Sequence, residues 1–293
     1  AWNDSLFMES WEVKCVSDTR PPFYEITEVK PLNNATPHAL FIDLGASASD
    51  VWVMNDGYWG IAVTEGQRYN FQFYLFTEEL KNTVVTAALL DREEQIVVSK
   101  NFQIERDGSW NHYEGTFTVD TTANDLRFAL LLPHKGKVYI DFVSMFPENT
   151  FCGHKNGLRE DVAGMLRDLR PDFVRWPGGC IVEGLTMDNR IKWKETIGDI
   201  VKRPGEYNLW GYRSTYGFGY HEFLQFCEDI DADGMFVCNA GMSCLFRNGD
   251  YWEEENRIDN LIQDALDAIE YALGDTTTVY GKRRAENGHA APF

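Results

Sequence analysis

The sequence predicts a multidomain chain: an antiparallel, jelly-roll-like β-sandwich at residues 1–147, followed by an incomplete (β/α)8 TIM barrel at 148–293. Three observations support this fold class. Apolar residues recur at every second position through much of the first half, as in half-buried strands. After Phe146-Pro147 the apolar period changes to about 3.6 residues, which is the period of a helix. From there, helices and short apolar strands alternate, which implies parallel strands joined by crossover helices.

The first domain shows no regular pattern in residues 1–36, which we expect to be irregular. The clearest strand lies at 68–77, where four apolar side chains share one face. Many short strands at close spacing, without helical periodicity, indicate an antiparallel sandwich. The expected strands are 38–44, 68–77, 83–90, 95–104, 112–119, 126–132 and 138–145.

The second domain begins after a linker at 148–157. Its predicted order is helix, strand, helix, strand, helix, with a long polar connection at 185–210 lying over the strand ends. The apolar residues of the last helix are expected to face inward. A complete (β/α)8 barrel needs eight strands in about 250 residues, so two strands make this one incomplete. The predicted helices are 158–169, 220–230 and 254–273, and the predicted strands are 173–176 and 235–238.

The stretch 173–184, FVRWPGGCIVEG, carries the main functional signal. Its strand stops at Pro177, which cannot donate to a sheet, and the two glycines that come next allow a sharp turn. Arg175 precedes the turn and Cys180 and Glu183 come after it, at a strand end, where barrels place their chemistry. The alternative is an ordinary strand end in which Arg175 forms a structural ion pair. A phosphate loop is disfavoured, because the turn has no lysine and Pro177 lacks an N–H donor.

Charge and composition narrow the class of partner. The formal net charge of −19 argues against nucleic acid and anionic membranes, since both attract basic patches. No apolar run approaches the roughly 20 residues that span a bilayer. We therefore expect no nucleic-acid and no membrane partner. Nine tryptophans and thirteen tyrosines favour a carbohydrate ligand, although any single ring in a sandwich is more often a core residue.

The six cysteines form no C-x-x-C pair and show no metal-like spacing, so the sequence predicts neither a disulfide framework nor zinc. Cys227 and Cys238 lie in apolar patterns and are expected to be buried thiols. His154, His221 and His289 have no partner pattern that suggests a catalytic triad.

Several short motifs keep the order and spacing of one enzyme family. With FVRWPGGC, they resemble the alpha-L-arabinofuranosidases of glycoside hydrolase family 51 over about residues 150–293. A weaker resemblance, over roughly residues 1–147, is to the carbohydrate-binding β-sandwich often inserted in bacterial members; the runs 57–63 and 138–142 carry it. The motifs are Trp193-Lys194-Glu195-Thr196-Ile197-Gly198, Arg203-Pro204-Gly205, Trp210-Gly211-Tyr212 and Tyr220-His221-Glu222-Phe223.

The resemblance implies hydrolysis of terminal arabinofuranosyl groups of arabinan or arabinoxylan, with retention and with no metal or organic cofactor. It implies that the acid/base and nucleophile glutamates lie beyond Phe293, so we expect no catalytic residue and no turnover in this chain alone. A pair supplied by the chain itself, from Glu183, Asp188 and Glu222, is a less favoured alternative. Glu222 is expected on a solvated helix face.

The resemblance also assigns supporting roles. Arg175 is expected to hydrogen-bond the nucleophile and keep it ionised, because a nearby cation lowers a carboxylate pKa. Gly179 and Cys180 are expected to border the arabinofuranose, and Asn239 ends the next strand toward the pocket. Glu183 belongs to the same group without a defined role. The aromatic candidates are Trp193 and Trp210 for the leaving-group side of the pocket, and Trp52, Tyr58, Trp59 and Trp110 for glycan stacking on the sandwich.

A second hypothesis is a non-catalytic carbohydrate-binding protein whose α/β part is a remnant. An extracellular or periplasmic location is favoured, although no signal peptide is visible. The chain starts with Ala rather than Met, so we expect an incomplete N-terminus. Some relatives in the family are homo-oligomers, and a homo-oligomeric parent is therefore one expectation.

Overall fold

The computed structural model describes residues 8, 10–17, 20–249, 251 and 255–293. The chain divides into two compact units, Ala1–Glu160 and Asp161–Phe293. This division falls later than the predicted boundary at 147/148, because the segment after the last strand remains attached to the first unit. The Glu148 amide donates to the Arg68 carbonyl (2.8 Å), and the Glu148 carboxylate pairs with the Arg68 guanidinium (3.1 Å).

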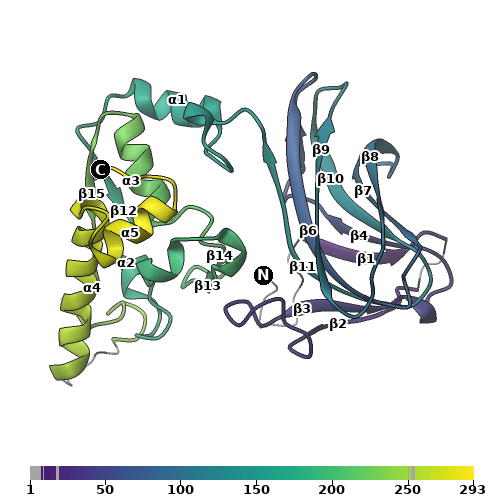
Figure 1. Cartoon of the computed structure of the whole chain (residues 1–293), viewed down its shortest axis with the longest axis horizontal. Coiled ribbons are helices and arrows are strands. Elements are labelled where there is room, and N and C mark those ends of the chain that lie inside the picture. The colour runs from purple at the N-terminus through teal and green to yellow at the C-terminus, as the bar shows by residue number, and fades with distance from the viewer. Residues whose placement is uncertain (1–7, 9, 18–19, 250, 252–254) are drawn as a thin grey trace. The chain divides into compact units, whose positions relative to one another are not determined.

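The first unit is a sandwich of two antiparallel sheets, as the alternating pattern predicts (Figure 1). One sheet has the order β1-β4-β10-β7-β8, with β5 paired to β10, and the other has the order β2-β3-β11-β6-β9. The strands are β1 (Trp11–Cys15), β2 (Phe23–Thr27), β3 (Ala39–Asp43), β4 (Val51–Asn55), β5 (Ile61–Val63), β6 (Arg68–Glu78), β7 (Val84–Leu90), β8 (Ile96–Gln103), β9 (Trp110–Thr118), β10 (Ala123–Leu132) and β11 (Lys137–Pro147).

Apolar residues from the inner faces of both sheets fill one continuous core. On β6 the alternate residues from Tyr69 to Leu75 are buried, while Asn70 and Gln72 point away from the core. Aromatic rings dominate the contacts, and the Phe71 and Phe117 rings stack with their centroids 4.1 Å apart. Large buried rings contribute strongly to stability, because each removes much apolar area from water.

The sequence pattern did not predict four of the strands, namely β1, β2, β4 and β5. β1 and β2 lie in the segment that we expected to be irregular, and each is five residues long. β4 is buried on both faces, because Trp52 and Met54 pack in a separate apolar cluster outside the main core. A strand buried on both faces shows no alternation, so its period gives no signal.

The second unit contains a parallel pair of strands, β12 (Phe173–Trp176) and β15 (Asp233–Phe236), as the order of elements predicts. Between them lie the five-residue helix α2, a long connection and α3. The sequence did not predict α2, α5, the β13–β14 hairpin or the short 3-10 helices η3 (Trp193–Thr196) and η4 (Ile200–Lys202) in the connection. The remaining elements are α1 (Glu160–Asp168), α2 (Gly179–Glu183), β13 (Glu206–Tyr207), β14 (Arg213–Ser214), α3 (Tyr220–Asp229), α4 (Glu255–Leu273) and α5 (Val279–Glu286).

An aromatic cluster joins these elements. Trp176, at the end of β12, stacks on Phe223 of α3 and on Phe236 of β15, with ring centroids 5.6 and 6.1 Å apart. Tyr271 of α4 is fully buried in the same cluster. Arg284 of α5, also fully buried, donates to the Tyr271 carbonyl (2.6 Å) and so fastens α5 to the end of α4.

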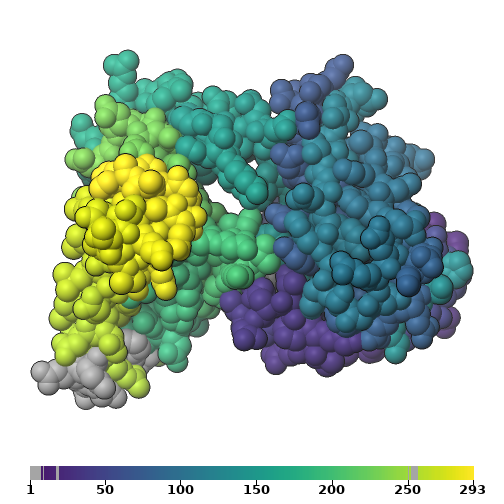
Figure 2. All heavy atoms as spheres, in the orientation of Figure 1, coloured from purple at the N-terminus to yellow at the C-terminus, as the bar shows by residue number. Residues whose placement is uncertain are grey.

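Large parts of the helix surfaces are apolar and exposed. On α4, only Leu261, Ala268 and Tyr271 of the apolar residues fall below a tenth exposed, so the expectation that the whole apolar face turns inward is wrong for this structure. α4 lies at the surface of its unit, coloured yellow-green in Figure 2. None of the helices described is long and apolar enough to cross a bilayer. The exposed apolar residues are Val162, Met165 and Leu166 on α1, Leu169 directly after it, and Ile262, Leu266, Ile269 and Leu273 on α4.

Glu222 does not lie on a solvated face, contrary to our expectation. Both of its carboxylate oxygens accept from the guanidinium of Arg203, at 2.8 and 3.0 Å, and the Arg203 side chain is only 4% exposed. The same carboxylate accepts from the Gly219 amide (2.9 Å) at the start of α3. This bidentate pair therefore fixes the connection against α3.

We predict that Glu222→Gln destabilises the second unit by about 3 kcal/mol, because it leaves a buried guanidinium without its counter-charge. Denaturant unfolding followed by tryptophan fluorescence measures the loss. Glu286→Gln, at an exposed position on α5, is the matched control and should change stability by less than about 0.5 kcal/mol. Equal stabilities for the two variants would contradict the structural role of the pair.

Candidate active site at the strand ends

The carboxyl ends of β12 and β15 lie side by side. Arg175 is opposite Met235 and Trp176 is opposite Phe236, and the Val237 amide donates to the Trp176 carbonyl (2.8 Å). The Trp176–Pro177 peptide bond is cis. The chain then turns through Gly178, whose φ of 117° is unfavourable for a residue with a side chain.

Arg175 is exposed at this edge. Its guanidinium lies over the turn, where methyl groups added at Gly178 or Gly179 would be 3.8 Å from its nitrogens. Among the residues that the structure describes, Arg175 forms no hydrogen bond and no ion pair. The alternative of a structural ion pair therefore finds no support, and the cation remains available to an anionic group.

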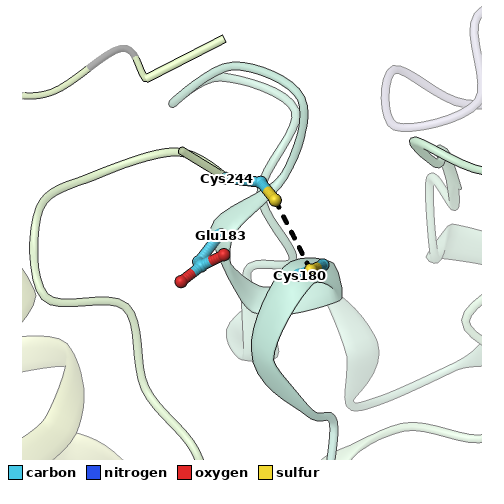
Figure 3. Close-up of side chains that lie close together, drawn as sticks. All are labelled: Cys180, Glu183 and Cys244. Atoms are coloured by element: carbon cyan, nitrogen blue, oxygen red, sulfur yellow. Dashed lines mark hydrogen bonds between the residues drawn. The ribbon is translucent and has the colours of Figure 1, made fainter. Parts of the chain in front are cut away.

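Two cysteines and a glutamate meet beside the turn (Figure 3). Cys180 and Glu183 are on α2, and Cys244 comes from the loop after β15. The Cys244 thiol donates to the Cys180 sulfur at 3.4 Å, and ligand atoms of all three residues lie within 4.8 Å of one another. The hydrogen bond to Cys180, together with burial, raises the pKa of the Cys244 thiol. The spacing of the cysteines gave no sign of this cluster, because only the fold brings these loops together.

Asn239 connects the same two segments. Its side-chain amide donates to the Val182 carbonyl of α2 (3.0 Å) and to the Met242 carbonyl (2.9 Å), and its oxygen accepts from the Gly241 amide (2.6 Å). Both amide protons are thus used within the protein. Asn239 lies three residues beyond the end of β15, because the strand ends at Phe236 rather than at Cys238 as predicted, and it fixes the loop that carries Cys244.

The two tryptophans expected on the leaving-group side of the pocket differ in their exposure to solvent. Trp193 is 5% exposed, packs in the aromatic cluster and donates its indole N–H to the Asp264 carbonyl (3.0 Å). It lines a small cavity with Phe236 and Asn239, so its role on the leaving-group side stays a prediction, but it presents little ring face to a ligand. Trp210, beside the β13–β14 hairpin, is 51% exposed and is free to present its ring face.

The buried-thiol prediction holds for Cys227 on α3, but it is wrong for Cys238, which is exposed immediately after β15. Parallel pairing with β12 places β15 two residues earlier than predicted, so Cys238 lies beyond the strand. The histidines have structural partners. His221 bonds with the Tyr271 hydroxyl (2.8 Å), and His289 with the Glu228 carboxylate (2.8 Å).

The four aromatic residues of the sandwich that we considered for glycan stacking also differ in their exposure to solvent. Trp59 and Tyr58 are 93% and 66% exposed, on a tight turn in which the Gly60 amide donates to the Asp56 carbonyl (2.9 Å). Trp52 is buried outside the main core, so a stacking role for it is wrong. Trp110 is half-buried, and its indole N–H donates to the Pro31 carbonyl (3.1 Å), so its ring edge is fixed within the sandwich and its stacking role stays a prediction.

Sequence reasoning missed a polar groove of about 610 Å³ on the sandwich. Its floor runs along the outward residues of β6 and β9, which pair with Asn70 opposite Thr116 and Gln72 opposite Glu114. The Thr116 hydroxyl donates to the Asn70 side chain (2.7 Å). Polar residues at the outward positions of both predicted strands were visible in the sequence, but their pairing was not.

The comparisons with known proteins match the two halves of the chain to two different families. Residues 165–293 match the family described as "Alpha-L-arabinofuranosidase 1 domain", and residues 46–136 match the family described as "Carbohydrate binding domain". A family 51 alpha-L-arabinofuranosidase, solved with bound arabinose, superposes on 98% of this chain with a TM-score of 0.87 at 27% identity, and 46% of that protein is covered.

Curated relatives give the same result. The extracellular exo-alpha-L-arabinofuranosidase of Streptomyces chartreusis is 36% identical over 86% of this chain and 31% of its own length. Alpha-L-arabinofuranosidase 1 of Arabidopsis thaliana is 35% identical over 85% of this chain, and alpha-L-arabinofuranosidase A of Aspergillus niger is 32% identical over 90%. The chain spans less than half the length of these relatives, which it covers by 31, 36 and 42%. Its residues 165–293 therefore carry an alpha-L-arabinofuranosidase domain, and the chain as a whole is similar to the alpha-L-arabinofuranosidases of glycoside hydrolase family 51.

Proposed function

We propose that the protein containing this chain is a retaining alpha-L-arabinofuranosidase, which releases terminal arabinofuranosyl groups from arabinan- or arabinoxylan-type polysaccharides. The observation that carries the proposal is the position of Arg175 at the carboxyl ends of two parallel strands that are paired in register. Its guanidinium has no hydrogen-bond or ion-pair partner among the described residues. Gly179 and Cys180 border the same turn. The names of the relatives support the reaction, and the arabinose in the superposed enzyme supports the sugar.

We infer further that β12 and β15 are neighbouring strands of a (β/α)8 barrel. Their parallel pairing, with α3 in the connection, is the repeating unit of that fold. The exposed apolar faces of α1 and α4 support the inference, because contiguous apolar surface of this kind is normally covered by another element. Further barrel elements would cover them.

In this proposal Arg175 acts on a nucleophile that residues 1–293 do not supply. A guanidinium within about 4–6 Å of a carboxylate lowers its pKa by about 1–3 units, which keeps it ionised and nucleophilic. The nucleophile and the acid/base carboxyl must lie about 5–5.5 Å apart for retention. Trp210 is proposed as a wall for the leaving group, and an extracellular location is proposed because the Streptomyces relative is named extracellular.

The sandwich is proposed to bind the polysaccharide in the groove over β6 and β9. Amide, hydroxyl and imidazole groups line it, and the His112 ring bonds with Gln72 (2.9 Å) and stacks on Tyr74 with centroids 4.6 Å apart. Such groups match the donors and acceptors of sugar hydroxyls. The exposed Tyr58 and Trp59 rings form a second candidate surface.

The non-catalytic alternative predicts binding without hydrolysis. A chromogenic alpha-L-arabinofuranoside, tested on residues 1–293 and on the full-length gene product, separates the two. We predict turnover by the full-length protein alone, because a retaining glycosidase needs two carboxyl groups in place. Hydrolysis by residues 1–293 that disappears in Glu183→Gln would instead make Glu183 catalytic. Absence of hydrolysis by both proteins would favour the binding-only function.

In the full-length protein, we predict that Arg175→Gln lowers kcat/KM about 100-fold. Removal of the cation raises the nucleophile pKa, so the acidic limb of the pH profile moves to higher pH by about one unit. Arg175→Lys should restore part of the activity, and Arg170→Gln, at an exposed arginine, is the control. A loss of activity with an unmoved acidic limb would count against a role beside the nucleophile.

For the sandwich, we predict that His112→Ala combined with Gln72→Ala weakens binding of arabinan or arabinoxylan by about tenfold, because two polar contacts to the glycan are lost. Affinity electrophoresis in gels with and without each polysaccharide measures the change. The control pair is Thr86→Ala with Asn101→Ala, which removes an exposed hydrogen-bonded pair (2.8 Å) from the other sheet. Weakening by Trp59→Ala alone would place the binding surface on the 55–60 turn instead.

A further inference from the structure

The cluster of Cys180, Glu183 and Cys244 is held in place from two sides. The Cys244 amide donates to the Gly184 carbonyl at the end of α2 (3.0 Å), and Asn239 joins the Cys244 loop to Val182 of the same helix. Backbone and side-chain bonds therefore fix the spacing of the two thiols, which lie 64 residues apart in sequence. Figure 3 shows the sulfur atoms turned toward each other with the Glu183 carboxylate beside them.

The chemistry of these groups is that of metal ligands. Cys244 is 1% exposed, Cys180 is partly exposed, and the Glu183 carboxylate makes no hydrogen bond or ion pair with any residue that the structure describes. Two thiols 3.4 Å apart approach the separation of sulfur ligands in a tetrahedral zinc site, about 3.8 Å for zinc–sulfur bonds of about 2.3 Å. The two sulfur atoms need to separate by only a few tenths of an ångström, and the Glu183 carboxylate, whose oxygen lies within 4.8 Å of them, needs to rotate toward them to complete it.

We propose that Cys180, Glu183 and Cys244 form a binding site for one thiophilic divalent cation of the zinc type. The two sulfur atoms and one carboxylate oxygen would fill three positions, and water or another ligand would fill the fourth. Two sulfur ligands select against magnesium and calcium, which prefer oxygen. The negative net charge of the chain favours cation binding in general.

A cation bound at this site would affect activity, because the site lies beside the proposed sugar pocket. This inference rests on the proposed function. Cys180 comes directly after Gly179 and lies at the turn where we place the arabinofuranose. A cation held by Cys180 occupies part of that space. The site is therefore inhibitory, and zinc should raise KM for the arabinofuranoside in the full-length enzyme.

Binding can be measured without activity. Cd²⁺ is titrated into the reduced, metal-free chain, and the ultraviolet band of sulfur-to-cadmium charge transfer reports thiolate ligation; Zn²⁺ then competes. We expect one equivalent to bind, more tightly at pH 8 than at pH 6, because ligation displaces the thiol protons. The band should be lost in Cys180→Ser and Cys244→Ser, and affinity should fall about tenfold in Glu183→Gln.

Matched controls are Cys227→Ser for a buried thiol and Cys238→Ser for an exposed one, and both should bind as the wild type does. If a variant does not fold, the wild-type chain can be tested alone. Mass spectrometry then shows which thiols zinc protects from alkylation. Protection confined to Cys180 and Cys244 supports the site. Absence of a band and of protection, or a band that survives Cys244→Ser, overturns it.

The two proposals fail in different ways. If the full-length protein does not hydrolyse arabinofuranosides but the chain binds cadmium through Cys180 and Cys244, the metal site stands and the proposed function falls. If zinc inhibition is unchanged in Cys244→Ser, the inhibitory consequence is overturned.

Discussion

The parallel pairing of β12 with β15 is the constraint on which the candidate site depends. Four residue pairs in register bring Arg175 and the segment beginning at Val237 to the same edge. Trp176 secures this register, because its ring stacks on both the neighbouring strand and α3. Without that packing, a strand of four residues has too few hydrogen bonds to hold a guanidinium in a defined place.

The segment after β12 forms a compact arrangement built on backbone bonds. The Pro-Gly-Gly turn leads directly into α2, and the loop after β15 returns to α2 through Asn239 and Cys244. The result concentrates a cation, two thiols and a carboxylate within one edge of the second unit. Polar groups gathered at strand ends are the usual place for chemistry in parallel α/β folds, since loops there converge from several strands.

In the sandwich, the alternation of apolar residues predicts which side chains fill the core, but it does not predict which outer side chains can bind a ligand. Its inner face is set by alternation, and the large side chains from Tyr69 to Leu75 fill the core as the period requires. Its outer face is where ligands can act, and the period says only that those residues are polar and outward. Trp52 shows the limit, because a second apolar cluster buries a ring that the sequence offered as a candidate for glycan stacking.

The sequence by itself determined the fold class of the sandwich, the main helices and the two parallel strands of the second half, and the position of Arg175 at a strand end. These features arise from local rules, because periodicity, proline and glycine act over a few residues. Only the tertiary structure decided that Trp193 is buried, that Glu222 pairs with Arg203, and that Cys180 meets Cys244. Contacts between residues tens of positions apart depend on how the helices and strands pack against one another. Local periodicity and residue spacing do not predict that packing.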